Sequence, residues 1–166
     1  MKRTESTEDE VDSREGALVR PMLENDLEKI MEIELASFTS PWSPFAFTSE
    51  LKENDYARYF CLEVSGQIVG YMGLWFILEE GHITNVAITP LYRGNRWGEY
   101  LMRSVMKMML SEGMERMTLE VRASNSPAQQ LYERLGFVKA GVRKGYYSDN
   151  REDAIIMWLD LGKESN

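Results

Sequence analysis

The sequence predicts one mixed α/β domain, on three observations. Apolar runs rich in β-branched and aromatic residues recur along the chain, as at 59–64 (YFCLEV) and 67–77 (QIVGYMGLWFI), and such runs are typical of strands. Between them lie segments whose apolar residues recur at helical spacing, most clearly over 97–109. The length of 166 residues suits one domain, and no internal repeat or linker divides the chain.

The two ends are expected to lie outside this domain. Residues 1–16 are charged and have almost no apolar side chains, so burial cannot offset their ordering entropy and we expect a disordered tail. The domain is expected to cover 17–161, and 162–166 are expected to form a C-terminal tail.

The first half is expected to contain a strand, two helices and a hairpin. The strand is ALVRP at 17–21, and the helices cover 24–38 and 45–52, separated by an irregular connection because TSPWSPF contains two prolines. Ser65-Gly66 reads as the hairpin turn between the two apolar runs at 59–77. After the polar residues 79–81, a further strand is expected at 82–89.

The second half is expected to alternate helices and strands. Asn125 or Ser126 can cap a helix that has Pro127 in its first turn and Gly136 as its stop. The expected elements are a helix from Arg96 to near Gly113, a strand at 117–121, a helix over 127–135, and strands around 137–145 and 154–161.

Composition excludes several classes of function. With one cysteine, Cys61, and one histidine, His82, the chain can form no internal disulfide and we expect no metal site. The net charge of −8 argues against general nucleic-acid binding, which requires a basic face. No apolar run is long enough to span a membrane and the N-terminus lacks the apolar core of a signal peptide, so the cytoplasm is the expected location.

The hexad RGNRWG at 93–98 stands where a strand gives way to a helix. Glycines allow close approach of a ligand, and unpaired N–H groups at a helix N-terminus bind phosphate. The hexad is neither a Walker loop, which ends in Gly-Lys-Ser/Thr, nor a dinucleotide fingerprint, which needs three spaced glycines. Taken alone, it could equally be a glycine-softened turn that begins a core helix.

The hexad resembles the cofactor loop of the GNAT superfamily of acetyl-CoA-dependent N-acetyltransferases, whose pattern is Gln/Arg-x-x-Gly-x-Gly/Ala. Arg93 and Gly98 fit its ends, whereas Arg96 stands where the family usually has glycine. We therefore expect position 96 to act through a helical backbone, with a side chain able to reach a phosphate. The segments LEVRASNSPAQQLYERLGF, PWS, GVRKGYY and EDAIIMWL are similar to the RimI-type subfamily, and the resemblance covers about 17–161.

The resemblance implies a twisted, mostly antiparallel sheet of about seven strands flanked by helices, with strands four and five splayed around acetyl-CoA. Asn125 would contact the pantetheine arm, although it could be only a helix cap. Main-chain groups of strand four would pair with the same arm, and the hexad would hold the pyrophosphate. The cofactor residues implied are Val86, Ala87, Ile88, Arg93, Gly94, Asn95, Arg96, Trp97, Gly98, Glu99 and Asn125.

Acetyl transfer requires a base to deprotonate the amine and an acid to protonate the departing thiolate. By resemblance these are Glu120 on the fifth strand and Tyr132 on the following helix. From the residues alone, Glu120 could point to solvent and Tyr132 could be a core aromatic, in which case Tyr146 or Tyr147 is the alternative acid.

Other conspicuous residues receive structural readings. His82 is expected to lie well away from the catalytic positions, and Cys61 is expected in the core. The segment around Trp42 could form a wall of a peptide groove or a lid on the core, and the resemblance favours the groove. Glu34 could attract a basic peptide start.

The function implied by the resemblance is acetylation of a protein N-terminal α-amine, that of the N-terminal alanine of a small-subunit ribosomal protein. Two alternatives stay open: acetylation of a small amine or lysine side chain, and acyl-CoA sensing without catalysis. The expected partners are acetyl-CoA and the acceptor protein's N-terminal segment, without direct nucleic-acid or membrane contact. The enzyme is expected to act as a monomer.

Overall fold

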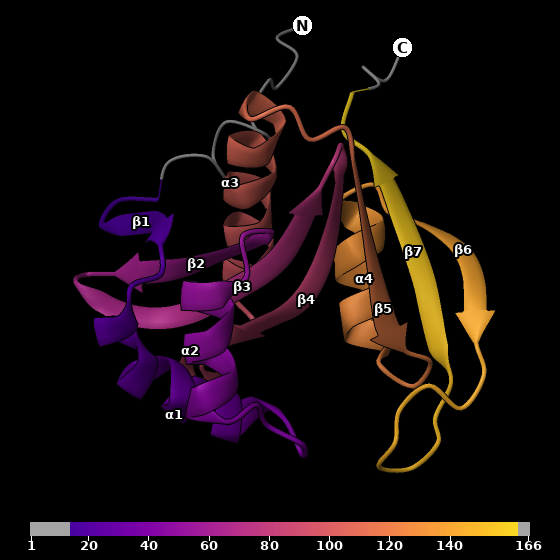
Figure 1. Ribbon diagram of the computed structural model, residues 1–166, viewed down its shortest axis with the longest axis horizontal. Helices are drawn as coiled ribbons and strands as arrows, with labels where there is room; N and C mark the ends of the chain where they lie inside the picture. Colours follow the sequence, from indigo (N-terminus) through magenta and orange to yellow (C-terminus); the bar gives the residue numbers. More distant parts are fainter. Residues whose placement is uncertain (1–13, 163–166) are drawn as a thin grey trace, which may run out of the picture.

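A computed structural model describes residues 14–162 of the chain. One seven-stranded sheet has the order β1-β2-β3-β4-β5-β7-β6, and every neighbouring pair is antiparallel except β4 and β5. The predicted α/β class and mostly antiparallel seven-stranded sheet are therefore confirmed (Figure 1). The strands are β1 Ala17–Pro21, β2 Ala57–Val64, β3 Gln67–Ile77, β4 Glu80–Ile88, β5 Arg116–Arg122, β6 Val138–Arg143 and β7 Ala154–Asp160.

Within residues 14–162, four α-helices and two short 3₁₀ helices accompany the sheet. The α-helices are α1 Leu27–Ser37, α2 Pro44–Glu53, α3 Trp97–Ser111 and α4 Ser126–Arg134; the 3₁₀ helices are η1 Glu24–Asp26 and η2 Pro90–Tyr92. The first helix thus begins three residues later than predicted, because Glu24–Asp26 is 3₁₀. None of the helices within 14–162 combines the length and apolar character needed to cross a membrane.

Local signals account for several element boundaries. The Ser43 hydroxyl accepts a hydrogen bond from the Ala46 N–H at 3.1 Å, which caps α2. The Asn125 side chain does the same for α4 through the Ala128 N–H at 3.2 Å. Ser65 and Gly66 both have positive φ, as a two-residue type I′ hairpin turn between β2 and β3 requires.

One predicted boundary was wrong. Residues 79–81 were expected to connect two strands, but β4 already begins at Glu80, which pairs with Ile77 on one side and Arg116 on the other. The turn consists of Leu78, whose φ is +57°, and Glu79, so only Glu79 of the three residues lies in the connection. Polar side chains alone therefore do not mark a connection, because the backbone of such residues can still pair within a sheet.

The sheet separates two hydrophobic clusters. One contains Met72 and Leu74 of β3 with side chains of α3, including Leu101 and Val105. The other contains Tyr71 of β3 with side chains of α1 and α2. Because successive side chains of a strand point to opposite faces, α3 and α1–α2 cover opposite sides of the sheet.

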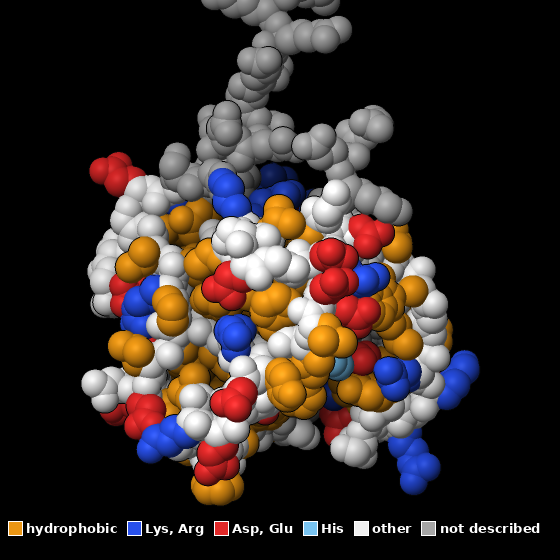
Figure 2. Space-filling view, turned by 45° about the horizontal axis from the view of Figure 1, so that its top comes forward, with side chains coloured by type: hydrophobic (Ala, Val, Ile, Leu, Met, Phe, Trp, Pro, Cys, Tyr) orange, Lys and Arg blue, Asp and Glu red, His pale blue; other side chains and the backbone are white. Residues whose placement is uncertain are grey.

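Beside the hydrophobic clusters, the described surface carries mixed charge. Figure 2 shows Lys and Arg side chains lying singly among acidic and apolar ones on the face it presents. Residues 1–13, most of the predicted tail, lie outside the described residues. Arg14 forms part of a turn and stacks on the Trp97 ring at 4.2 Å, so this part of the predicted tail contacts the domain.

Candidate functional site

The two parallel strands separate along their length and open a cleft. β4 and β5 pair only over Glu80–His82 and Arg116–Thr118, and beyond these residues they are not hydrogen-bonded to each other. Their ribbons diverge towards the bottom of Figure 1. The cleft has a volume of about 1000 Å³, within the range of sites for small organic ligands.

Residues from both halves of the chain line this cleft. The α1–α2 connection, the end of β4, the start of α3, β5, α4 and the loop after β6 all contribute. All the site residues predicted from the sequence except Asn95 are among the lining residues: Val86, Ala87, Ile88, Arg93, Gly94, Arg96, Trp97, Gly98, Glu99, Glu120, Asn125 and Tyr132.

The loop before α3 presents a row of unbonded N–H groups. Among the hydrogen bonds formed within 14–162, none is donated by the backbone N–H groups of residues 94–99. A helix leaves its first N–H groups without intrahelical partners, and the loop extends that row. Gly94 has φ +83° and Gly98 has no neighbouring atom closer than 3.6 Å to its added Cβ position. The backbone is thus accessible to an anion.

Arg96 adopts a conformation that differs from the prediction. It was expected to have a helical backbone, but its φ of +60° and ψ of +23° are left-handed. Glycine reaches this region freely, whereas other residues are disfavoured there by about 1–2 kcal/mol. Arg96 therefore holds a backbone conformation that glycine adopts more readily.

Three other side chains of the loop are engaged within the protein. The Arg93 guanidinium donates to the Ile88 carbonyl at 2.8 Å and to the Ser37 hydroxyl at 3.0 Å. Glu99 is buried and accepts from Arg103 at 3.0 Å. The Asn95 side chain faces the Arg93 carbonyl at 3.5 Å. Any ligand contact from these three positions would come mainly from the backbone.

The end of β4 keeps one backbone edge free of strand pairing. Residues 86–88 pair with β3 on one side but not with β5 on the other. Their side chains pack into the two hydrophobic clusters. The structural and binding readings of these residues are therefore compatible, because binding would use the main chain.

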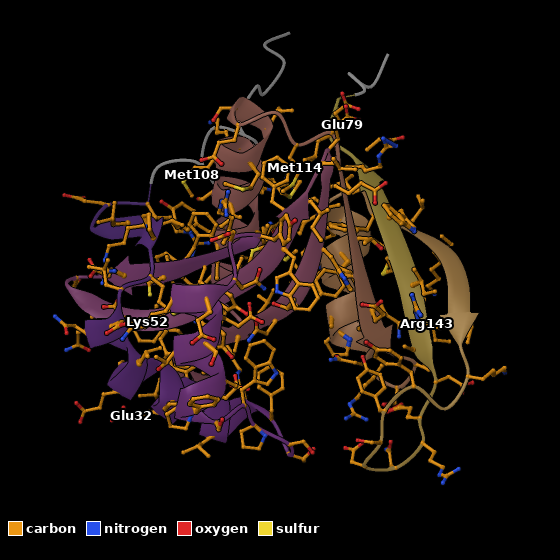
Figure 3. The ribbon with its side chains drawn as sticks, in the orientation of Figure 1. Glu32, Lys52, Glu79, Met108, Met114 and Arg143 are labelled. Atoms are coloured by element: carbon orange, nitrogen blue, oxygen red, sulfur yellow. The ribbon has the colours of Figure 1, made fainter. Side chains whose placement is uncertain are left out.

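Glu120 of β5 lines the cleft and forms a carboxylate–imidazole pair with His82 of β4. His82 Nε2 lies 2.6 Å from Glu120 Oε2, and Arg143 Nε lies 3.6 Å from Glu120 Oε1. Arg143 is on the β6 side of the divergence (Figure 3). The hydrogen bond from His82 is the main cause that lowers the pKa of Glu120, against the opposing effect of burial, and Arg143 adds to the lowering.

Two readings from the sequence are settled by this pair. The Glu120 side chain is only 10% exposed, so it does not simply point to solvent. The prediction that His82 lies well away from the catalytic positions was wrong. His82 pairs with Thr118, two residues before Glu120, so both side chains lie on the same face. Only the β4–β5 register reveals this, and no local sequence signal contains it.

Two tyrosines also line the cleft. Tyr132 of α4 is partly buried and packs against Phe137 with 5.9 Å between ring centroids. Burial raises the pKa of Tyr132 to about 12. The pKa of Tyr147 is also raised to about 12, mainly by burial, and its ring lies 3.9 Å beneath the Arg122 guanidinium carbon. Both phenols therefore keep their protons at neutral pH.

The α1–α2 side of the cleft is held by a buried acid. Glu34 accepts hydrogen bonds from the Trp42 N–H at 2.9 Å and from the Tyr71 hydroxyl. Its side chain is buried, and burial raises its pKa. Glu34 thus anchors the loop around Trp42, and because it also lines the cleft, its suggested attraction for a basic peptide start stays a prediction. Trp42 itself lines the cleft and packs on Phe47 at 5.3 Å.

The other titratable groups suggest no further chemistry. Cys61 is buried as predicted, and burial raises its thiol pKa to about 12. Within 14–162 no group of three or more His, Cys, Asp or Glu side chains is arranged to hold a metal ion.

Comparisons with known proteins identify relatives over almost the whole chain. Residues 27–137 match the Acetyltransferase (GNAT) family. A Bacillus subtilis (strain 168) protein, named provisionally as a ribosomal protein bS18-alanine N-acetyltransferase, is 46% identical over 89% of this chain and 97% of its own length. The ribosomal protein bS18-alanine N-acetyltransferase of Haemophilus influenzae is 36% identical over 80% of this chain and 90% of its own.

Among solved structures, the crystal structure of the ribosomal-protein-S18-alanine N-acetyltransferase from Escherichia coli is similar. It superimposes with a TM-score of 0.81 at 32% identity, covering 90% of this chain and 97% of that one.

Proposed function

Because the chain belongs to the acetyltransferase (GNAT) family, we propose that it transfers the acetyl group of acetyl-CoA to a protein N-terminal α-amine. The acceptor proposed is the N-terminal alanine of a small-subunit ribosomal protein, as the names of its relatives suggest. One observation carries the catalytic part of the proposal. A single cleft has unbonded N–H groups at the start of α3 and, on β5, the Glu120 carboxylate held by His82.

The residues fit the cofactor at two places. The N–H groups of 94–99 would hold the pyrophosphate at the positive end of α3. The free edge of β4 at 86–88 would pair with the amides of the pantetheine arm, on the side where β5 has separated. Acetyl-CoA supplies the thioester that the amine attacks.

Glu120 and His82 would manage the proton of the amine. An α-amine has a pKa near ~8, so at neutral pH a nearby acceptor must first take a proton from the ammonium. The neutral nitrogen then bonds to the thioester carbonyl carbon. As the carbon–sulfur bond breaks, the nitrogen gives up its second proton and the sulfur takes one up. Glu120 lines the cleft and is ionised, while the His82 side chain is 38% exposed and can pass the proton on to water. Glu120 is therefore the proposed base, and His82 positions it.

Tyr132 would protonate the departing sulfur. Its raised pKa keeps the phenol protonated at neutral pH, so that a proton is available where the sulfur departs. Its hydroxyl takes part in none of the hydrogen bonds formed within 14–162, so no intramolecular bond has to break first. Tyr147 remains the alternative acid.

The acceptor would enter beside Trp42 and Tyr147, which line the same cleft. This entrance lies between the α1–α2 connection and the loop after β6, which meet where the Thr39 hydroxyl donates to Asp149 at 3.2 Å. A small-amine acetyltransferase or an acyl-CoA sensor has no specific observation in its favour. We also propose that the enzyme acts as a monomer in the cytoplasm, without direct contact with nucleic acid or membrane.

A peptide panel tests the proposed function. Purified protein and acetyl-CoA would be incubated with peptides that differ only at residue one, and products would be measured by mass spectrometry. The controls are an N-terminally blocked peptide containing lysine, and spermidine. We expect acetylation of the α-amine, fastest with alanine first. Turnover of only the lysine peptide or spermidine would overturn the acceptor assignment, and acetyl-CoA binding without any turnover would favour a sensor.

A further inference from the structure

Arg96 is an exposed cation at the rim of the cleft. It takes part in none of the ion pairs or side-chain hydrogen bonds formed within 14–162. Its backbone holds the left-handed conformation that glycine adopts without strain. A non-glycine residue at such a position carries a conformational penalty, and strain of this kind clusters at ligand-binding sites. The side chain therefore needs an explanation that the turn alone does not provide.

The other arginines that line the cleft differ in whether their guanidinium groups are bonded within the described chain. Arg93 is bonded to Ile88 and Ser37, and Arg122 is paired with Asp149 at 2.9 Å and with Glu152 at 3.5 Å. Arg134 at the end of α4, like Arg96, is exposed and forms no ion pair within the described residues.

The two unpaired arginines belong to adjoining elements. An added Cβ at Gly98, in the first turn of α3, would lie 3.6 Å from Leu131 of α4, and Arg134 is three residues further along that helix. Residues three apart on a helix lie on one side of it. A chain with a net charge of −8 thus keeps two guanidinium groups that line the cleft and have no ion-pair partner within 14–162.

Acetyl-CoA carries a second anionic group besides its pyrophosphate, the phosphate on the ribose 3′ carbon. In the proposed function the backbone N–H groups of 94–99 bind the pyrophosphate, and this binding requires no side chain. We propose that Arg96, assisted by Arg134, binds the 3′-phosphate and makes the enzyme select acetyl-CoA over its 3′-dephospho form. This inference rests on the proposed use of acetyl-CoA and names the residues that recognise its 3′-phosphate. A guanidinium suits the task because it can bind phosphate through two parallel N–H bonds.

The substitution Arg96→Gly tests this with little risk to the fold, because glycine adopts the observed backbone readily. Affinities for acetyl-CoA and 3′-dephospho-acetyl-CoA would be measured by calorimetry. We expect Arg96→Gly to weaken acetyl-CoA binding about 10- to 100-fold, as for loss of a charge-assisted contact, and to leave binding of the dephospho form unchanged. Arg134→Gln should weaken acetyl-CoA in the same selective way.

Arg151→Gly is a matched control. Arg151 is also an exposed arginine with a left-handed backbone, at φ +58°, but it does not line the cleft. The Arg151→Gly variant should bind acetyl-CoA and its 3′-dephospho form as the wild type does. Equal weakening of both ligands by Arg96→Gly would place Arg96 on the pyrophosphate and overturn the proposal, as would unchanged affinity for both.

These failures differ from failure of the proposed function. If the wild type neither binds acetyl-CoA nor acetylates any amine, the proposed function is wrong. If the wild type acetylates peptides but prefers neither ligand form, only the 3′-phosphate assignment is wrong.

Discussion

The two walls of the cleft differ in how their polar groups are satisfied. At the start of α3, the N–H groups of 94–99 and the Arg96 guanidinium have no partner within the described chain. On the β5 wall, Glu120 is held by His82 and Arg143, and Arg122 by Asp149 and Glu152. Both walls are polar, but of these two only the start of α3 has hydrogen-bond donors without a partner in the described chain.

The difference indicates separate tasks for the two walls. Donors left open can be completed by a ligand, so the α3 end is suited to binding an anion. Groups already fixed by internal hydrogen bonds do not reorganise during a reaction, so the β5 wall is suited to chemistry. Substitutions on the two walls should therefore affect different measurements, turnover on one wall and affinity on the other.

The largest expected effect concerns Glu120. Glu120→Gln should lower turnover by about 10²–10⁴-fold because the proton acceptor is lost, while calorimetric affinity for acetyl-CoA stays near that of the wild type. The deficit should shrink at high pH, where the amine loses its proton unaided. Wild-type turnover at neutral pH would show that another group, or water, takes the proton.

Tyr132 should give the next largest effect. Tyr132→Phe removes only the hydroxyl, so packing on Phe137 and cofactor affinity should persist while turnover falls about 10²-fold. Tyr147→Phe is the comparison, since Tyr147 has an equally raised pKa and lines the same cleft. If Tyr132→Phe stays within about twofold of wild type and Tyr147→Phe is the slow variant, the acid is Tyr147.

A substitution at Gly98 tests the other wall, at the start of α3. Gly98→Val should weaken acetyl-CoA by about tenfold or more, since steric overpacking costs about 1–3 kcal/mol. Gly98→Ala is the control for folding, because its Cβ would meet Leu131 and Ile88 at ordinary contact distances of 3.6 and 3.8 Å. Unchanged calorimetric affinity in folded Gly98→Val would return the hexad to being a turn only.

The smallest effect expected is a change in pH dependence. The hydrogen bond from His82 is the main cause of the lowered Glu120 pKa, so His82→Leu should raise that pKa. The acid limb of kcat/KM should then move to higher pH, because the base is protonated sooner as pH falls. Arg143→Met should shift it in the same direction but less, since Arg143 has the weaker influence. A shift to lower pH in His82→Leu would contradict this arrangement.

Much of the fold followed from local patterns in the sequence. The helices, the hairpin at Ser65-Gly66 and the cap at Asn125 were predicted within a few residues, because periodicity, turn residues and caps act over short stretches of chain. The family resemblance added the splayed strands, which the limited pairing of β4 with β5 matches. The resemblance also selected the catalytic residues, and their roles stay predictions.

Three features were decided only by the tertiary structure. His82 meets Glu120 because a parallel register places two strands side by side whose paired residues are 36 positions apart, as in Glu80 with Arg116. Glu34 is buried because α1 packs on the face of β3 that carries Tyr71. Arg96 takes a left-handed backbone conformation immediately before α3, which its residue type does not indicate. The first two depend on contacts between distant segments, whereas periodicity and capping report only on neighbours along the chain.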